Sequence, residues 1–520
     1  MITVALPVLI PLTAGALCLL VWGRARLQAG LAIAALAGML ASSAALLIRA
    51  DSGAIDVMHF GAWDAPVGIT FVSDRFGALM SVLASLVGLA AAIFSVGSLD
   101  PARARGGHYP LLLTLVGAVA GAFLTGDLFN LYVWFELLLL SSFVLLTLGG
   151  TRPQLEGAIK YVTLNLIGSL LFLATVGLIY GATGTLNMAH LSRLVPELDP
   201  TFATALAAPL LVAFGIKAAV FPVFFWLPAS YHTPPPVVSA LFAGLLTKVG
   251  VYALIRSVLL FAGQETGLLA TVVLWTAGLT MLTGVLGAVA QSDMRRILSF
   301  HIVSQIGYML MGLGVSMAVV ARGGPEAGGL AALALAGSVF YIFHHIVVKT
   351  NLFLVSGAVI RARGDSNLAG LGGLLATHPA LAGLFLFSAL SLAGIPILSG
   401  FWAKVALVKS GLIAGQWAIV AASLVVSILT LFSMMKIWTG AFWGATPASA
   451  PPAGARERRL GASIYGPIAG LAAVTLALAA GGSVAFGFAS RTAEQLLDPA
   501  DYQRAVLPAS VAPASAGGEG

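Results

Sequence analysis

Residues 217–256 read KAAVFPVFFWLPASYHTPPPVVSALFAGLLTKVGVYALIR, two apolar runs that are joined by a proline-rich turn and that each carry one lysine. The second run is long enough to cross the roughly 30 Å hydrocarbon core of a bilayer as a helix. A charged side chain at the bilayer centre costs about 2.5 to 3.5 kcal/mol, so stability alone would not select Lys217 or Lys248. The stretch therefore predicts membrane-spanning helices whose function depends on buried charge.

The rest of the chain has the same apolar character. Its 520 residues are 59% hydrophobic and 9% charged, with a mean hydropathy of +1.01, whereas soluble domains are about 25% charged. Apolar runs of about 20 residues recur along the chain, and we predict an all-α polytopic membrane protein with about 14 transmembrane helices. The predicted spans start near residues 2, 28, 76, 109, 128, 159, 202, 237, 268, 299, 330, 381, 416 and 464.

Basic residues indicate membrane anchoring and the orientation of the chain. The formal net charge is +7, but the basic residues stand singly or in pairs between apolar runs, so no nucleic acid is expected as a partner. Thirteen of the loop lysines and arginines fall in odd-numbered loops and six in even-numbered ones. The positive-inside rule then predicts that both termini face outward. The first apolar stretch has no basic residue ahead of it and is long for a signal peptide, so we expect a retained first span.

Cysteine usage limits the cofactors that the chain could hold. Cys18 is the only cysteine, which excludes an intramolecular disulfide and a four-cysteine iron–sulfur site. Phosphate-binding loops, nucleophile elbows and metal-ligand clusters are also absent from the sequence in the right context. We therefore expect no metal and no cofactor, and any redox group would belong to a partner.

The predicted organisation has five parts. Residues 1–108 hold three spans and, at 49–74, a small outward hairpin. Two five-helix repeats follow at residues 109–263 and 264–443. A loop with the last span then covers residues 444–490, and a mobile tail covers residues 491–520. Leucines at helical spacing in residues 186–198 predict a short helix on the membrane surface.

Two spans contain residues that break helices. Pro222 interrupts the seventh apolar run, and Gly394 and Pro396 interrupt the twelfth. Paired interrupted helices in two halves of a transporter indicate its ion path. They favour an internal repeat in which the ninth to thirteenth spans correspond to the fourth to eighth. The offset between corresponding residues is not constant, however: Lys217 and Lys404 are 187 residues apart, whereas Pro222 and Pro396 are 174 residues apart.

Glu136, Lys217 and Lys248 are the first candidate site residues, because intramembrane ionisable residues are functional by default. Glu136 lies in DLFNLYVWFELLLLSSFVLLTLGG, in an otherwise uncharged span, and Lys217 stands five residues before the break at Pro222. The alternative is structural: Glu136 would cap a backbone group, or the three would form ion pairs that only hold helices together.

A second group of candidates follows in the later spans. His345 and Lys349 are four residues apart, so they share one helix face and could pass a proton along the axis. Lys404 lies beyond the second break and is buried only if the span is broken or tilted; otherwise it snorkels to the membrane edge. A polar stripe at helical spacing is a candidate for water binding and consists of His301, Ser304 and Tyr308. His344 is expected to be a packing histidine. Lys409 and Lys436 lie closer to the ends of their spans and are expected to snorkel.

Four segments together resemble a known family. TGDLFNLYVWFELLLLSSFVLLTLGG, the stretch at 217–256, FHHIVVKTNLFLVSGAVI and GIPILSGFWAKVALV resemble the antiporter-like subunits shared by respiratory complex I and the Mrp multisubunit cation/proton antiporters. The resemblance implies fourteen helices, two inverted five-helix repeats with broken seventh and twelfth spans, and a central hydrophilic axis. It also implies that Glu136 modulates Lys217 and that Lys248, His345, Lys349 and Lys404 continue a proton relay.

The function expected from this resemblance is proton translocation, not enzyme catalysis. The chain would be a subunit of a Na⁺(K⁺)/H⁺ antiporter complex in a bacterial inner membrane, with other membrane subunits as partners. Nothing in the sequence resembles a dehydrated Na⁺ cage of carboxylates and carbonyls, which favours a cation path in a partner. Two alternatives stay open: a proton-pumping subunit of complex I or of a membrane-bound hydrogenase, and an assembly scaffold whose polar residues only hold helices together.

Overall fold

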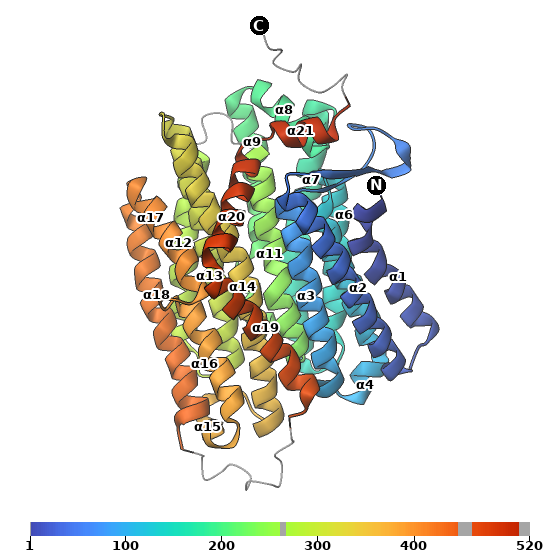
Figure 1. The fold of residues 1–520 in the computed structure, drawn as a ribbon, viewed down its shortest axis with the longest axis vertical. Helices are drawn as coiled ribbons and strands as arrows, with labels where there is room; N and C mark the ends of the chain where they lie inside the picture. The colour runs from blue at the N-terminus through green and yellow to red at the C-terminus, as the bar shows by residue number, and fades with distance from the viewer. Residues whose placement is uncertain (1, 261–266, 446–459, 509–520) are drawn as a thin grey trace.

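The computed structural model is a bundle of long, roughly parallel helices (Figure 1). It describes residues 2–260, 267–445 and 460–508. Within these ranges, 13 helices are long and apolar enough to cross a membrane. The long apolar helices, with the short segments at their ends, are η1–α1 (Ile2–Ala5, Leu6–Leu20), α2 (Ala25–Asp51), α3 (Arg75–Ser98), α4–η3–α5 (Pro101–Arg103, Ala104–His108, Tyr109–Leu124), α6 (Leu128–Thr147), α7 (Arg152–Thr183), α9 (Pro200–Ala218), α11 (Pro236–Leu260), α12 (Gly267–Ala290), α13 (Met294–Arg322), α14 (Ala327–Arg363), α18–η6 (Trp417–Ile437, Trp438–Trp443) and α19 (Ala462–Ala480).

A further span is divided into two shorter helices, α16 (Pro379–Ala393) and α17 (Ser399–Ile413). Together with the 13 helices above, this pair matches the predicted spans in number, and each span starts within about eight residues of the predicted position. The division falls where the sequence predicts it, because α16 ends one residue before Gly394, whose φ is +87°. The seventh span is likewise interrupted between Ala218, where α9 ends, and α10 (Trp226–Ser230).

Aspartates begin several of the helices. A carboxylate at the N-cap accepts a hydrogen bond from a backbone N–H of the first turn that has no partner within the helix. Asp74 accepts from the Gly77 amide at 2.8 Å, and Asp127 from the Asn130 amide at 2.7 Å. The same arrangement is found at Asp100, Asp199 and Asp293. These caps fix where a span enters the bundle.

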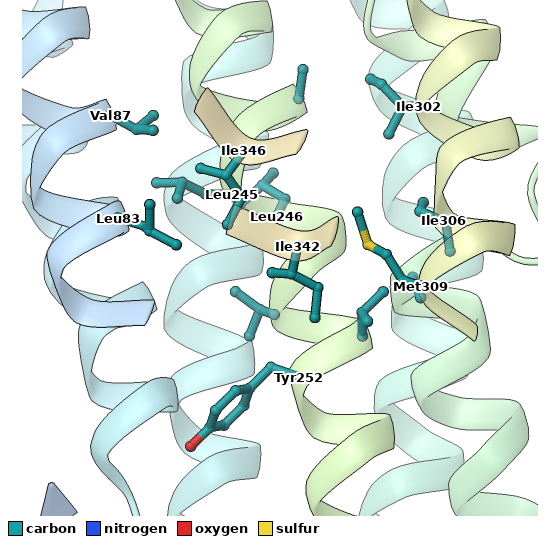
Figure 2. Close-up of a cluster of buried hydrophobic side chains, with 14 of the residues drawn as sticks. Leu83, Val87, Leu245, Leu246, Tyr252, Ile302, Ile306, Met309, Ile342 and Ile346 are labelled. Carbon is teal, nitrogen blue, oxygen red and sulfur yellow. The ribbon is translucent and has the colours of Figure 1, made fainter. Parts of the chain in front are cut away.

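Helix α14 is at the centre of the bundle and packs against α3, α11, α13, α16, α17, α19 and α20. Figure 2 shows its apolar core, in which Ile342 and Ile346 of α14 lie near Leu245 and Leu246 of α11. Helices α11 and α13 are buried on every side within their apolar windows. A helix that is apolar on all sides and enclosed by other helices holds any polar residue away from lipid. Helices α11, α13 and α14 therefore define the interior of the bundle.

The predicted hairpin is present as strands β1 (Asp56–His59) and β2 (Thr70–Ser73), which pair antiparallel with Asp56 opposite Ser73, while its outward orientation stays a prediction. The 3₁₀ turn η2 (Phe60–Ala62) follows β1. Residues 186–198 contain the predicted short helix as α8 (Met188–Leu194) and the 3₁₀ turn η4 (Val195–Glu197). The hairpin and α8 lie at one end of the bundle, called here the hairpin end (Figure 1). At the opposite end lie η5 (Leu368–Gly370) and α15 (Leu374–Thr377).

The segment after residue 491, predicted as a mobile tail, is different in the part that the structure describes. Residues up to 508 contain the end of α20 (Gly482–Leu497) and α21 (Ala500–Val506), and residues 509–520 lie outside the described ranges. Helix α20 is amphipathic: Ala489, Thr492 and Ala493 are buried, whereas Arg491 is exposed. The abundance of Ala, Pro and Ser over the whole tail obscures this short periodic pattern in the sequence.

Each of the two predicted repeats contains an isolated β-bridge, and the two bridges lie at corresponding positions. Asp127, at the start of α6, bridges to Asn187 after α7, and Asp293, at the start of α13, bridges to Asn367 after α14. Each bridge consists of two backbone hydrogen bonds of 2.8 to 2.9 Å. This correspondence agrees with an internal repeat, and the inversion of one half relative to the other stays a prediction.

Candidate functional site: a row of buried ionisable residues

Lys217 lies in the last turn of α9, directly before the interruption of the seventh span. It is 5% exposed, and its Nζ donates to Ser169 Oγ on α7 at 2.8 Å. The ammonium also lies 5.6 Å from the centroid of the Phe135 ring, a cation–π distance. Glu136, the next residue on α6, acts on Lys217 through its charge. Glu136 is only partly buried, and its Oε1 has no hydrogen-bond partner among the described residues.

The interruption itself is held by side chains that satisfy the freed backbone groups. Trp226 Nε1 donates to the Ile216 carbonyl at 3.1 Å, and Thr280 Oγ1 accepts from the Phe221 amide at 2.9 Å. Gly250 of α11 lies against the same point, where a Cβ would come within 2.5 Å of the Ala218 nitrogen. Non-helical backbone survives at membrane depth only where protein groups or water replace its lost bonds.

Lys248, His345 and Lys349 form the central group of the site. All three are completely buried, on α11 and α14. Lys248 Nζ donates to the Ala243 carbonyl, and Lys349 Nζ donates to the Leu298 carbonyl at 3.4 Å. The charge of Lys349 acts on Lys248, and both lysines act on His345. Both ring nitrogens of His345 lack a partner among the described side chains and backbone groups, so the imidazole is free to accept or donate a proton.

The stripe of His301, Ser304 and Tyr308 on α13 lies between the central group and α18. His301 Nε2 is 2.5 Å from Ser433 Oγ, and the Tyr308 hydroxyl is 2.8 Å from Ser427 Oγ. Two of the three residues therefore attach α13 to α18, while water binding by the stripe stays a prediction. The charges of Lys349 and Lys404 both act on His301.

Lys404 is buried, with 7% of its surface exposed. Its Nζ donates to the carbonyls of Leu392 and Ala393 at 3.3 and 2.8 Å and to Ser427 Oγ at 3.1 Å. The two carbonyls belong to the last turn of α16, so the lysine caps the helix end that the break leaves open. The ammonium of Lys404 thus points back toward α16, which agrees with the buried alternative for this residue.

None of these lysines forms an ion pair with a carboxylate within the described part of the chain. The ion pairs found there join other residues, namely Arg49–Asp56, Arg103–Asp100, Lys160–Glu156, Arg256–Asp74, Arg491–Asp51 and Arg504–Asp501. Lys217, Lys248, Lys349 and Lys404 use hydroxyls and carbonyls as acceptors instead. The structural ion pair considered for Lys217 and Lys248 is therefore absent from this part of the protein.

The candidates fall into two groups. Lys217 with Glu136 forms one, and the residues from Lys248 to Lys404 form the other; α9 and α11 pack directly against each other between them. His344 Nδ1 is 2.8 Å from Ser399 Oγ at the start of α17, whereas its Nε2 has no hydrogen-bond partner among the described residues, so only half of this ring is satisfied. Lys436 caps the end of α12 through the Val289 and Gln291 carbonyls, and Lys409 is exposed. No group of three or more His, Cys, Asp or Glu residues in the described ranges could hold a metal ion.

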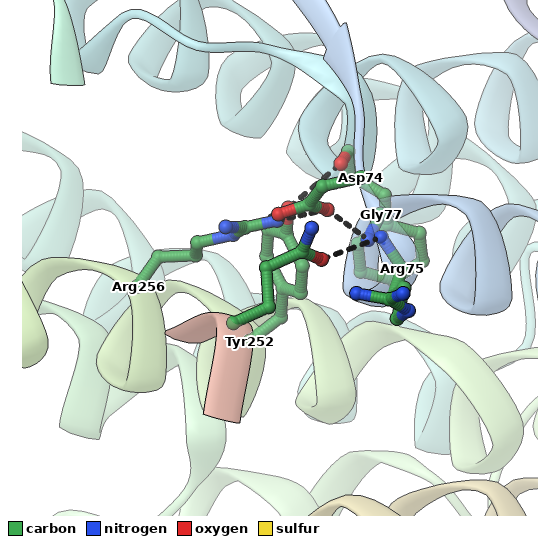
Figure 3. A network of polar contacts seen from close by, with 7 residues as sticks. Asp74, Arg75, Gly77, Tyr252 and Arg256 are labelled. Atoms are coloured by element: carbon green, nitrogen blue, oxygen red, sulfur yellow. Dashed lines mark hydrogen bonds and ion pairs between the residues drawn. The ribbon is translucent and has the colours of Figure 1, made fainter. Parts of the chain in front are cut away.

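A buried polar network at the hairpin end was not predicted from the sequence (Figure 3). The guanidinium of Arg256, on α11, lies 2.5 Å from the carboxylate of Asp74, which is 1% exposed. Arg256 Nε also donates to the Tyr252 hydroxyl at 3.0 Å, and Gln495 accepts from the Arg75 amide at 3.1 Å. By sequence alone Arg256 counts as a loop residue. Its spacing of eight residues from Lys248 on the same helix is the signal that could have indicated burial.

A bundle with two interrupted spans and a row of lysines that form no ion pair with a carboxylate of the described residues is typical of a class: ion-translocating membrane subunits. The profile of the family described as NADH:quinone oxidoreductase/Mrp antiporter, TM, matches residues 125–430, and the chain belongs to this family. The resemblance inferred from the four segments is thus confirmed.

Relatives and solved structures are similar over nearly the whole chain. The D subunit of the Na(+)/H(+) antiporter of Alkalihalophilus pseudofirmus is 44% identical over 505 residues, which cover 97% of this chain and 99% of the relative. A chain in the structure of the Mrp complex from a Dietzia species is 37% identical with a TM-score of 0.88, covering 98% of this chain and 100% of that one. A chain of respiratory complex I from Thermus thermophilus shares the fold, with a TM-score of 0.81 at 23% identity, over 95% of this chain and 100% of that one.

Proposed function

We propose that this chain is the proton-translocating subunit of a Na⁺(K⁺)/H⁺ antiporter complex in the bacterial inner membrane, where it acts together with other membrane subunits. Its similarity to the D subunit of a Na(+)/H(+) antiporter and to a chain of an Mrp complex supports this function. The observation that carries the proposal is the row itself. Buried ionisable side chains from α9, α11, α13, α14 and α17 lie inside the bundle and form no ion pair with a carboxylate in residues 2–260, 267–445 and 460–508. Because burying such groups lowers stability, their presence indicates a function.

Protons would enter near Glu136 and Lys217, cross through Lys248 and the pair of His345 and Lys349, and leave near Lys404. A unit charge about 4 Å away changes the energy of its neighbour by about 4 kcal/mol at an effective dielectric near 20. Loss of a proton at one lysine therefore makes protonation of the next one more favourable. Glu136 would set the starting charge state, because its carboxylate attracts a proton to Lys217.

The relay is tested by removing its first two members. Glu136→Ala and Lys217→Ala should each abolish cation/proton antiport in membrane vesicles, while the assembled complex is recovered in normal amounts. Lys409→Ala is the matched control, because Lys409 is an exposed lysine outside the row, and it should leave antiport unchanged. Antiport at the unsubstituted rate in either relay variant would refute the proposal.

Two rival functions make different predictions in the same preparation. A pumping subunit of complex I or of a membrane-bound hydrogenase should copurify with subunits that carry iron–sulfur motifs, whereas an antiporter subunit should copurify with other membrane chains only. An assembly scaffold should lose complex yield when its buried charges are removed, with little change in the transport rate of the complex that remains.

The proposed orientation puts both termini, and with them the hairpin end, on the outer face of the membrane, as the distribution of basic residues favours. In intact cells, a protease site fused to the N-terminus should be cleaved by added protease, whereas a site in the loop between α1 and α2 should be protected. The opposite pattern would reverse the assignment of the two faces.

A further inference from the structure

A groove of about 530 Å³ lies between α12, α13 and α18, which pack against one another at one side of the bundle (Figure 1). No residue of the row lines it, and the proposed relay gives it no role. Along α12 the lining runs from Gly267 to Leu282, which is about 22 Å at 1.5 Å per residue. Since half of the hydrocarbon core of a bilayer is about 15 Å thick, the groove is long enough to reach from the membrane surface to the midplane.

The groove opens on the outside of the bundle. Only 39% of the apolar windows of α12 and α18 is buried, against 100% for α13 behind them. Trp275 lines the groove and is 67% exposed. In a membrane, this face therefore meets either lipid or another subunit.

The polar side chains of the groove all lie at its hairpin end. They are Thr271 near the start of α12, Arg322 at the end of α13 and Gln416 directly before α18. Helix α13 begins beside η5 at the opposite end of the bundle, so it ends at the hairpin end. The exposed Trp417 follows Gln416, and tryptophans are enriched where a membrane meets water.

Two features give this polar end a positive charge. Arg322 is exposed, and its Nη1 donates to the Ala414 carbonyl at 2.6 Å, which uses one of the five N–H donors of a guanidinium. Within the described residues it forms no ion pair with a carboxylate. Helix α18 begins at the same end without a side-chain cap, so the free amides of its first turn add partial positive charge. This end of the groove suits an anion.

The remainder of the lining is apolar. Leu274, Leu279 and Ile419 form walls, and the small Ala318 and Ala422 leave the space between them. A positive end above apolar walls matches an anionic head with a hydrocarbon tail. An apolar helix of another subunit would fit the walls but would leave the guanidinium of Arg322 without an anionic partner.

We propose that this groove binds an anionic phospholipid, whose phosphate contacts Arg322 and the start of α18 while one acyl chain lies between α12, α13 and α18. Arginine binds phosphate through two parallel hydrogen bonds, and basic pockets between transmembrane helices bind anionic headgroups. The lipid bridges α13 and α18, which are also joined by the Tyr308–Ser427 hydrogen bond. The inference goes beyond the proposed function and does not depend on it.

Photo-crosslinking in vesicles of phosphatidylglycerol tests both the site and the orientation of the lipid. The purified complex is reconstituted with phosphatidylglycerol that carries a diazirine either near the carboxyl end or at the terminal carbon of an acyl chain. The first probe should label residues 271–275 and the second residues 279–282, as mapped by mass spectrometry of peptides from this chain. Labels spread evenly over the exposed faces of α2, α7 and α18 would refute the proposal.

Arg322→Gln tests recognition of the headgroup. Labelling of the groove should fall about fivefold, the factor expected from one basic residue near an anionic membrane surface. Lys409→Gln is the matched control, because Lys409 is exposed toward the same end of α17 and does not line the groove, so labelling should be unchanged. In the unsubstituted protein, a phosphatidylcholine probe should label the groove less than phosphatidylglycerol does. Equal labelling by the two lipids, or by Arg322→Gln and the unsubstituted protein, would overturn the assignment.

Ala422→Phe tests the place of the acyl chain. The added ring fills the apolar part of the groove, so it should remove most of the labelling of residues 279–282. Ala421→Phe is the matched control, since Ala421 is exposed on the same helix but does not line the groove. If Ala422→Phe instead releases another subunit while the lipid labelling is unchanged, the groove is a subunit contact and the proposal fails. Labelling is measured without antiport, so this result is independent of the relay.

Discussion

At the scale of single residues, the buried lysines of the row donate to uncharged oxygens: Lys217 donates to the Ser169 hydroxyl, and the others donate mainly to backbone carbonyls. Lys404 caps α16, Lys436 caps α12, and Lys349 donates to the Leu298 carbonyl. A carbonyl acceptor satisfies an ammonium without fixing its charge as a carboxylate would, so a proton can leave without a counterion being stranded. This distinguishes a relay from a set of structural ion pairs. It could not be predicted from sequence for Lys217, Lys349 and Lys404, because their acceptors belong to other helices.

Lys404→Met and Lys436→Met separate capping from proton transfer. Each substitution leaves two carbonyls without their donor, and each unsatisfied group costs about 1–3 kcal/mol, so both variants should unfold at a lower temperature in detergent. Only Lys404→Met should abolish antiport, because Lys436 lies outside the proposed row. Equal antiport in the two variants would show that Lys404 is a helix cap and nothing more.

At the scale of helices, the two interruptions give the site its shape. The sequence predicted both breaks, since Pro222 and the pair of Gly394 and Pro396 stand inside apolar runs. It did not predict how each break is held, because Trp226 and Lys404 reach their acceptors only after the chain has turned back on itself. Helix α20 was not predicted either, since its short amphipathic pattern is hidden in a tail of low-complexity composition.

Gly250→Ala should show how closely α11 is packed against the first break. The added Cβ would lie 2.5 Å from the nitrogen of Ala218 and 2.8 Å from the carbonyl carbon of Lys217, and backbone atoms cannot move aside cheaply. We expect a loss of about 1–3 kcal/mol in the free energy of unfolding, with reduced antiport because the end of α9 shifts. Thermal unfolding and vesicle transport measure the two effects.

Gly177→Ala is the control for this substitution. Gly177 lies on α7 with no other atom within 4 Å of its added Cβ, so the variant should be as stable as the unsubstituted protein or slightly more stable. Equal stability of the two alanine variants would contradict the close approach at Gly250.

At the scale of the whole molecule, the Arg256–Asp74 pair ties the first spans to the first predicted repeat, because Asp74 begins α3 and Arg256 lies near the end of α11. Span number, starting positions and the hairpin could be predicted from hydropathy and turn residues alone. The buried pair could not, since an arginine near the end of an apolar run has the same local pattern whether it faces a loop or the interior.

Arg256→Met should destabilise the protein by about 3–5 kcal/mol, because Asp74 is left buried and unpaired. The double variant Arg256→Met/Asp74→Asn removes both charges and should recover part of the lost stability. Thermal unfolding in detergent measures both, and a double variant that unfolds below the single one would contradict a stabilising role of the pair.

The capping of α16 by Lys404 has a further consequence when the proton leaves. A charged ammonium carries three N–H donors, and here they match three acceptors, the carbonyls of Leu392 and Ala393 and the hydroxyl of Ser427. A neutral amine has only two donors and one lone pair, so discharge either leaves a carbonyl of α16 without its donor or reverses the bond to Ser427, whose hydroxyl then donates to the amine. The departing proton thus rearranges either the end of α16 or the contact with α18, and a neighbouring subunit could respond to the charge state of Lys404 through this change.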